Sequence, residues 1–351
     1  MTETLSFLID ERDRGGPAQP LLSVKGLVKR FPVKSINPFA KKRHVSAVDG
    51  IDFEVLKGET LGVVGESGCG KSTTARLLMK LMPQDEGELL FDGEEIGVAL
   101  SVKEYRRNVQ MVFQDSYASL NPRLTIEQAI SFGPRMHGEA DGKALSDAHD
   151  LLERVGLDPG RFAGRYPHEL SGGQRQRINI ARALAFKPRL VILDEAVSAL
   201  DKSVEAQVLN LLLDLKRDLG LTYIFISHDL NVVQFMAQRV MVMYLGKVVE
   251  IGDCREVFAH PKHPYSSALL SSMPRVDPRN RTQRPPLSGD PPNPIDPPSG
   301  CRFHPRCFKA EGVCSTTSPE LFALDGDHRA ACLANIPGSG HSAASGNGVA
   351  A

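Results

Sequence analysis

Short apolar runs alternate with segments of helical spacing along most of the chain. The apolar runs predict strands at residues 21–31, 48–56, 60–64, 190–193, 222–227 and 240–244. Helical spacing predicts helices at residues 146–155, 171–186 and 203–218. The run at 190–193 is apolar at every position, which is typical of a strand buried on both faces of a parallel sheet. The alternation predicts an α/β core with parallel strands, preceded by an edge strand at 21–31.

The two ends of the chain differ in composition from this core. Residues 1–20 are polar and rich in Gly and Pro, so we expect a flexible N-terminus. Residues 274–300 contain nine prolines, which predicts an extended connector. Residues 337–351 consist largely of Gly, Ser and Ala and are expected to be disordered.

Charge and hydropathy narrow the class of protein. Lys and Arg together number 42, as do Asp and Glu, so the zero net charge gives no overall attraction to nucleic acid or anionic lipid. No apolar run approaches the roughly 18 residues that span a bilayer, and the acidic N-terminus has no signal-peptide pattern. We therefore expect a cytosolic protein that reaches a membrane through a partner.

The segment 65–72, Gly-Glu-Ser-Gly-Cys-Gly-Lys-Ser, fits the pattern G-x-x-x-x-G-K-S. It follows a predicted strand and opens a predicted helix, so backbone N–H groups and the helix N-terminus can surround a phosphate. Lys71 is expected to reach the β- and γ-phosphates, and the Ser72 hydroxyl to bind Mg²⁺. The predicted nucleotide-binding residues of this segment are Gly65, Glu66, Ser67, Gly68, Cys69, Gly70, Lys71, Ser72 and Thr73.

A second apolar strand ends in two acids, Asp194 and Glu195. An Asp at the carboxyl end of a buried strand can hold Mg²⁺ through water beside a phosphate loop. The adjacent Glu can orient and deprotonate an attacking water. Taken alone, the pair could be a solvated acidic turn. Together with the phosphate loop it predicts a nucleotide hydrolase.

Residues 170–174, Leu-Ser-Gly-Gly-Gln, open a predicted helix whose N-terminus suits a phosphate. With the phosphate loop before it and the acidic strand after it, the chain resembles the ABC-type ATPases. The resemblance implies a P-loop NTPase core with an antiparallel β-subdomain and a helical subdomain. It also implies that Ser171, Gly172, Gly173 and Gln174 cover ATP bound to a second subunit.

The resemblance assigns roles to further positions. Gln114 is similar to the loop glutamine that contacts Mg²⁺, with Ser72 and Asp194, and senses the membrane partner. His228 is similar to the histidine that hydrogen-bonds the γ-phosphate. The catalytic set is then Glu195, His228, Lys71 and Gln114.

Three more positions complete the comparison with the family. Asp201 lies in a loop that crosses the dimer interface in these proteins. Phe31 is placed like the aromatic residue that stacks on adenine, although it could equally belong to the core. The family usually has proline after the catalytic Glu, whereas this chain has Ala196, which is expected to leave chemistry possible with a slightly looser turn.

The resemblance is closest to the ATPase subunits of bacterial dipeptide and oligopeptide importers, and it covers about residues 22–333. It implies an ABC ATPase domain at 21–273 and, at 274–336, a Pro-rich linker with a cysteine-containing extension. The implied partners are a second ATPase subunit, two transmembrane permease subunits and an extracytoplasmic binding protein. The second ATPase subunit could be a copy of this chain, but a different chain is typical of the group.

Residues 115–123 are expected to contact a membrane-subunit helix at the cytoplasmic face of the inner membrane. Cargo stays open, with nickel, glutathione or an antimicrobial peptide as alternatives to peptides, and a non-transport ABC protein as the other class.

Four cysteines of the extension, Cys301, Cys307, Cys314 and Cys332, have the spacing C-x5-C-x6-C-x17-C. Four thiolates suit zinc or an iron–sulfur cluster, and these gaps are wider than those of zinc ribbons. The resemblance favours a [4Fe–4S] cluster with a structural role, while zinc and free thiols remain the alternatives.

Overall fold

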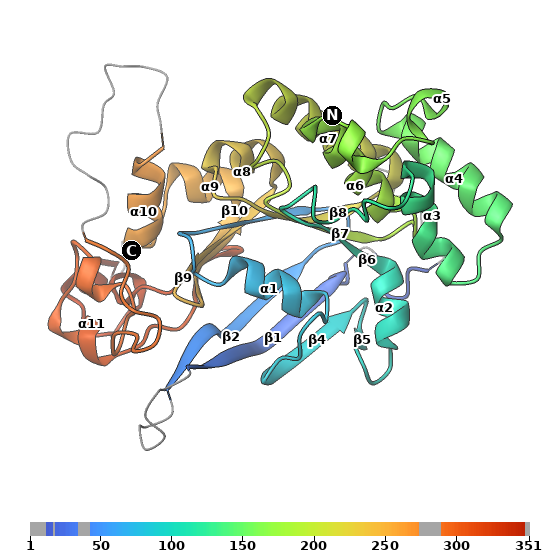
Figure 1. Ribbon diagram of the computed structural model, residues 1–351. Helices are drawn as coiled ribbons and strands as arrows, with labels where there is room; N and C mark the ends of the chain where they lie inside the picture. Colours follow the sequence, from blue (N-terminus) through green and yellow to red (C-terminus); the bar gives the residue numbers. More distant parts are fainter. Residues whose placement is uncertain (1–11, 17, 34–42, 274–288, 348–351) are drawn as a thin grey trace, which may run out of the picture.

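The computed structural model describes residues 12–16, 18–33, 43–273 and 289–347 (Figure 1). The first part of the expected Pro-rich linker, residues 274–288, lies outside these ranges. Eight strands form the core sheet in the order β11–β12–β10–β9–β3–β8–β7–β6. The bounds of these strands are β3 (Thr60–Val64), β6 (Val109–Val112), β7 (Leu190–Asp194), β8 (Thr222–Ile226), β9 (Arg239–Tyr244), β10 (Lys247–Asp253), β11 (Phe322–Asp325) and β12 (His328–Ala330). The five strands from β9 to β6 run parallel, which confirms the predicted α/β core.

A second, antiparallel sheet has the order β2–β1–β4–β5. Its strands are β1 (Leu22–Val33), β2 (Arg43–Val55), β4 (Glu86–Phe91) and β5 (Glu94–Glu95). The prediction that β1 is an edge strand is wrong, because β1 pairs with β2 on one side and with β4 on the other. That pairing joins segments far apart in the sequence, so the pattern within 21–31 could not show it.

Helices cover both faces of the core sheet (Figure 1). The helices that precede the C-terminal extension are α1 (Lys71–Leu78), α2 (Val102–Asn108), α3 (Ile126–Met136), α4 (Asp141–Arg154), α5 (Pro159–Phe162), α6 (Gly172–Leu184), α7 (Lys202–Leu219), α8 (Leu230–Met236), α9 (Cys254–Ala259) and α10 (Pro264–Ser271). Alternate residues of β7 enter two apolar clusters. Leu190 and Ile192 pack with the antiparallel sheet and α1, whereas Val191 and Leu193 pack with α6, α7 and the helical subdomain of α3–α5.

The C-terminal extension is joined to the core sheet by backbone hydrogen bonds. It contains η3 (His304–Arg306), α11 (Gly312–Thr316), β11, β12, η4 (Leu333–Asn335) and η5 (Ser342–Asn347). Strand β12 pairs antiparallel with β10. The structure differs from the expected disordered tail up to residue 347, because His341 is buried and its Nε2 lies 2.9 Å from the Lys309 carbonyl.

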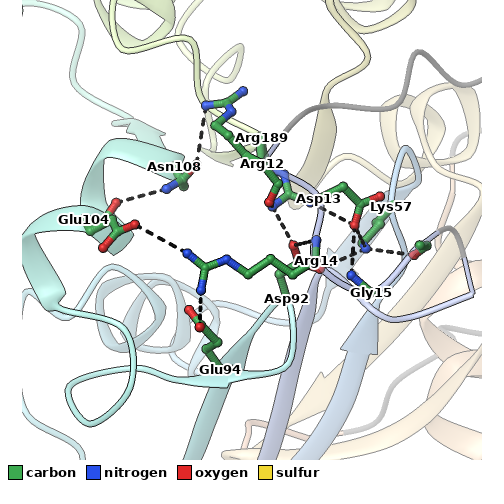
Figure 2. Close-up of polar contacts among 11 residues, drawn as sticks. Arg12, Asp13, Arg14, Gly15, Lys57, Asp92, Glu94, Glu104, Asn108 and Arg189 are labelled. Carbon is green, nitrogen blue, oxygen red and sulfur yellow. Dashed lines mark hydrogen bonds and ion pairs between the residues drawn. The ribbon is translucent and has the colours of Figure 1, made fainter.

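Residues 12–16 are tied to both sheets by a network of ion pairs (Figure 2). Asp92, in the turn between β4 and β5, lies 2.8 Å from Lys57 Nζ and 2.7 Å from Arg189 Nη1. Asp13 also contacts Lys57, and the Arg14 N–H donates to Asp92 Oδ2 at 3.0 Å. The structure therefore differs here from the expected flexible N-terminus, because partly buried charges on three segments hold these residues.

Within the described ranges, no helix combines the length and apolar composition needed to cross a bilayer.

Candidate functional site

The phosphate loop connects β3 to α1, and its turn requires glycine at particular positions. Gly65 and Gly70 have φ values of +151° and +111°, in the region that L side chains rarely adopt. A Cβ on Gly65 would lie 2.7 Å from Cys69 Sγ and would also meet the Met243 carbonyl, so the loop has no room for one. Burial raises the pKa of the Cys69 thiol, which therefore behaves as a small apolar residue within the loop.

The Lys71 ammonium lies inside this loop. It donates to the Gly65 carbonyl at 2.7 Å and to the Glu66 carbonyl at 3.0 Å, and the side chain is buried. Two carbonyl oxygens hold this ammonium, and among the described residues no carboxylate forms an ion pair with it as a counter-anion. Phosphate oxygens that entered the loop would supply one.

Ser72 and Asp194 meet beside the loop. The Ser72 hydroxyl donates to Asp194 Oδ1 at 3.1 Å, although the two residues are far apart in the sequence. Burial raises the pKa of Asp194, and the hydrogen bond from Ser72 partly opposes this rise. A hydroxyl and a carboxylate in contact are the hard oxygen ligands that Mg²⁺ prefers.

Glu195 is the centre of a second group. Gln114 Nε2 donates to Glu195 Oε2 at 2.7 Å, and His228 Nδ1 lies 3.5 Å from the same oxygen. Glu195 has a φ of +49°, an uncommon conformation for a residue with a side chain, of the kind found at active sites. Ser198 stabilises this turn without a proline, since its hydroxyl donates to the Glu195 carbonyl at 2.9 Å. Ala196 is buried in the same turn.

A cavity of about 310 Å³ contains part of the predicted site, and Asp194 and His228 are not among its lining residues. It is lined by Ser67, Gly68, Gly70, Lys71, Ser72, Thr73, Gln114 and Glu195. The structure adds residues that the sequence did not indicate: Val45, Ser46, Ala47, Leu245 and Pro294. Phe31 pairs with Val45 across the antiparallel sheet and is 37% exposed, which leaves its ring accessible at the rim.

The signature segment lies away from this cavity. Ser171 is the N-cap of α6, where it forms a reciprocal capping box with Gln174 that leaves Gly172 and Gly173 in the first turn. Asp201 is the N-cap residue of α7. None of these residues is among those that line the cavity in the described structure. The capping box uses the N–H groups of Ser171 and Gln174. The N–H groups of Gly172 and Gly173, at the start of the helix, are those that could face a group outside this chain's own phosphate loop.

Three contacts to the site come from beyond α9 and were missed by sequence reasoning. Glu66 of the phosphate loop donates its N–H to the Tyr265 hydroxyl at 2.8 Å and forms an ion pair with Arg306 at 2.8 Å. Arg302 contacts Asp49 and the Leu245 carbonyl. No local pattern marks these arginines. Their position next to Cys301 and Cys307 is the one signal that could have drawn attention to them.

The four cysteines of the extension line a single cavity with His304 and His341. Burial raises the pKa of the Cys301 and Cys307 thiols and raises that of Cys332 to about 11, so these thiols stay protonated at neutral pH unless a cation binds. Among the described residues, no three His, Cys, Asp or Glu side chains converge as one metal ion requires. The four cysteines predicted to bind a cluster therefore share a cavity but do not converge on one point.

Comparison with known proteins agrees with the geometry. Residues 48–198 match the ABC transporter family, and residues 249–314 match the oligopeptide/dipeptide transporter C-terminal region. The oligopeptide transport ATP-binding protein AppF of Bacillus subtilis is 47% identical over 320 residues, which cover 90% of this chain and 97% of AppF. The dipeptide transport ATP-binding protein DppF of Haemophilus influenzae is 49% identical over 309 residues, which cover 86% of this chain and 93% of DppF.

A solved structure supports the fold. The chain resembles cbiO1 from Clostridium perfringens, part of the ABC transporter complex cbiONQ, with a TM-score of 0.59 and 27% identity. The match covers 71% of this chain and 95% of cbiO1. The chain therefore belongs to the ATP-binding, ATP-hydrolysing proteins of the ABC transporter family, in the group that carries the oligopeptide/dipeptide transporter C-terminal region.

Proposed function

We propose that this chain is one of two ATPase subunits that energise the import of di- or oligopeptides by an ABC transporter at the cytoplasmic face of the cell membrane. The observation that carries the proposal is the cavity in which the phosphate loop faces Glu195 and Gln114. The names of AppF and DppF and the C-terminal region support the peptide cargo. We keep residues 21–273 as the ATPase domain and 274–336 as linker and extension.

In the proposed reaction, each group performs the task that its position allows. The glycine-rich loop and Lys71 bind the phosphates, and Ser72, Gln114 and Asp194 would hold Mg²⁺. Glu195 orients the attacking water, and His228 contacts the γ-phosphate. Catalysis of this kind consists mainly of positioning and charge stabilisation. Mg²⁺, when bound, neutralises charge that develops on the phosphate oxygens.

The site is complete only with a second ATPase subunit. We propose that residues 171–174 and Asp201 face ATP on that subunit, which is typically a different chain in this group. Phe31 would stack on adenine from the rim of the cavity. The N-terminus of α6 supports the arrangement, because a helix N-terminus suits a phosphate and residues 171–174 do not line the cavity of their own chain's loop.

Residues 115–123 are the proposed contact with a permease subunit. Tyr117 is 55% exposed in this segment. The segment is bound to α6, since Asn179 donates to the Ser116 carbonyl at 3.0 Å and Arg182 donates to the Ser119 carbonyl. A movement of the segment would therefore reach the signature at the start of α6.

The ATPase and the cargo are tested separately. Glu195→Gln should lower the turnover of ATP at least 100-fold while a fluorescent ATP analogue still binds, and Lys71→Ala should abolish binding of the analogue. Equal turnover in Glu195→Gln and the unmodified protein would refute the assigned base. Uptake of labelled di- and pentapeptides, nickel and glutathione, by cells with and without the functional chain, decides the cargo.

We also propose that Cys301, Cys307, Cys314 and Cys332 hold a [4Fe–4S] cluster as a structural cross-link of the extension. A cluster distributes its thiolate ligands around several iron ions, so cysteines that surround a cavity suit it better than a single zinc ion. Anaerobic purification should give absorption near 400 nm with bound iron and sulfide. Stoichiometric zinc, or neither metal, would refute the cluster and leave the ATPase unaffected.

A further inference from the structure

The C-terminal extension holds the phosphate loop through a single arginine. Arg306 Nη1 lies 2.8 Å from Glu66 Oε2, and Nη2 donates to Glu66 Oε1 at 3.1 Å. This two-point geometry between a guanidinium and a carboxylate fixes both position and orientation. The Arg306 side chain is only 5% exposed, so water screens the pair little.

An aromatic residue of the core, Tyr244, contacts this arginine. Its guanidinium lies 6.0 Å from the centre of the Tyr244 ring, and Nη1 is 3.4 Å from the Tyr244 hydroxyl. Tyr244 in turn packs against Tyr265, whose hydroxyl accepts the Glu66 N–H at 2.8 Å. The two tyrosines and the arginine thus form one support on the outer side of the loop.

Glu66 is fixed at three places within the loop. Its side chain is bound by Arg306, its N–H by Tyr265, and its carbonyl accepts from Lys71 Nζ at 3.0 Å. The Cys69 N–H donates to the same carbonyl at 3.3 Å. Residue 66 therefore connects the extension to the lysine that faces the phosphates.

We propose that Arg306 is a positioning residue of the nucleotide site, and that the extension sets the affinity of this chain for ATP by keeping Glu66 and the phosphate loop in the binding conformation. A loop that is already ordered loses less conformational freedom on binding. The inference rests on the proposed function, because it assumes that the nucleotide occupies this loop. It goes beyond that function by giving the extension a task in ATP binding.

The arginines are neighbours of the cysteines in the sequence, so this support depends on the cysteine cavity. Arg306 is the last residue of η3 and directly precedes Cys307, which lines the cavity. Arg302 directly follows Cys301 and contacts Asp49 and the Leu245 carbonyl, beside the nucleotide cavity. Whatever the cysteines bind, a change in their spacing displaces the two arginines that contact the ATPase core.

Two replacements of Arg306 in the full chain test the proposal. Arg306→Gln should raise the KM for ATP and the Kd of a fluorescent ADP analogue about ten-fold, since two charge-assisted hydrogen bonds are lost. The kcat should change less than about two-fold, because Glu195 and its partners are untouched. Arg306→Lys, which keeps the charge but not the two-point geometry, should give an intermediate KM.

Arg239→Gln is the matched control. Arg239 Nη1, in β9, lies 3.1 Å from Oε1 of Glu59, which directly precedes β3, and both side chains are largely buried. This pair is outside the nucleotide cavity, so the control should lower the melting temperature and leave the KM unchanged. Glu66→Ala should weaken binding of the ADP analogue as much as Arg306→Gln does. The double variant should bind the analogue no more weakly than either single variant, because both substitutions remove the same interaction.

The outcomes separate the possible explanations. If Arg306→Gln lowers only the melting temperature, as Arg239→Gln does, Arg306 merely attaches the extension and the inference is wrong. If the unmodified chain binds no nucleotide, the proposed function fails instead. If Arg306→Gln is insoluble, the KM of Arg306→Lys decides, and a value equal to that of the unmodified chain overturns the proposal.

Discussion

Replacement of Asp92 by Asn should cost this protein a large part of its stability. The Asp92 carboxylate is 3% exposed and binds two cations, Lys57 and Arg189, whose side chains are 11% and 10% exposed (Figure 2). Asn has nearly the same shape, and it tolerates the φ of +51° that residue 92 adopts. Asp92→Asn therefore removes the charge and leaves the backbone and the packing in place.

The magnitude follows from the partners that remain. Breaking a fully buried ion pair costs about 3–5 kcal/mol, because the other charge is left without compensation. Here Asp13 still contacts Lys57 and lies 3.8 Å from Arg189, and both cations keep some access to water. We therefore expect a loss of about 2–3 kcal/mol in the free energy of unfolding at neutral pH.

The effect should also depend on pH with a definite sign. Burial alone would raise the pKa of Asp92, but Lys57, Arg189 and the Arg14 N–H outweigh it and lower the pKa. A carboxylate with a lowered pKa contributes stability above its unfolded pKa of about 4, and this contribution is lost as the pH falls through the native pKa. The difference between Asp92→Asn and the unmodified chain should therefore shrink in acid.

Urea unfolding at neutral and acidic pH measures both effects. Glu94→Gln is the matched control, because Glu94 pairs with Arg14 in the same network and Arg14 is 55% exposed. An exposed pair of this kind contributes less than about 1 kcal/mol. If Asp92→Asn and Glu94→Gln destabilise the protein equally, burial does not govern the strength of this network and the reasoning is refuted.

Three further changes test other parts of the structure. Gly173→Ala should lower the melting temperature, because its Cβ would clash with Val204, whereas Gly172 has space and Gly172→Ala should be tolerated; equal effects would contradict the packing. Burial lowers the pKa of Lys216 to about 8, below the unfolded value of about 10. The free energy of unfolding should therefore rise as the pH increases from about 8 to about 10, and Lys216→Met should remove this rise in urea titrations. Burial lowers the pKa of His263 to about 4, so stability should fall as the pH decreases from about 6.5 towards 4. His263→Asn, whose side chain can still cap α10, should reduce this fall in thermal melts. An unchanged dependence of stability on pH would exclude His263 as the source of the fall.

The parts of the site that could be predicted from sequence are those that contiguous residues form. Residues 65–72 and the pair Asp194–Glu195 each combine a strand, a turn and a chemical group within a few positions, and the structure brings them to one cavity. The parts that could not be predicted depend on distant pairings. Glu66 and Arg306 are 240 positions apart, and nothing near either residue indicates the other. The central position of β1 was missed for the same reason, because strand neighbours are set by the whole sheet.

The pairing of β12 with β10 has a consequence for chains that lack their last residues. Without β12, the buried strand β10 would present unpaired N–H and C=O groups at the rim of the core sheet, beside apolar side chains such as Val248 and Ile251. An open rim of this kind is a template for pairing with other chains. The ribosome completes β10 well before β12, so every new molecule passes through an aggregation-prone interval. A protease cut after α10 would return a finished molecule to that condition.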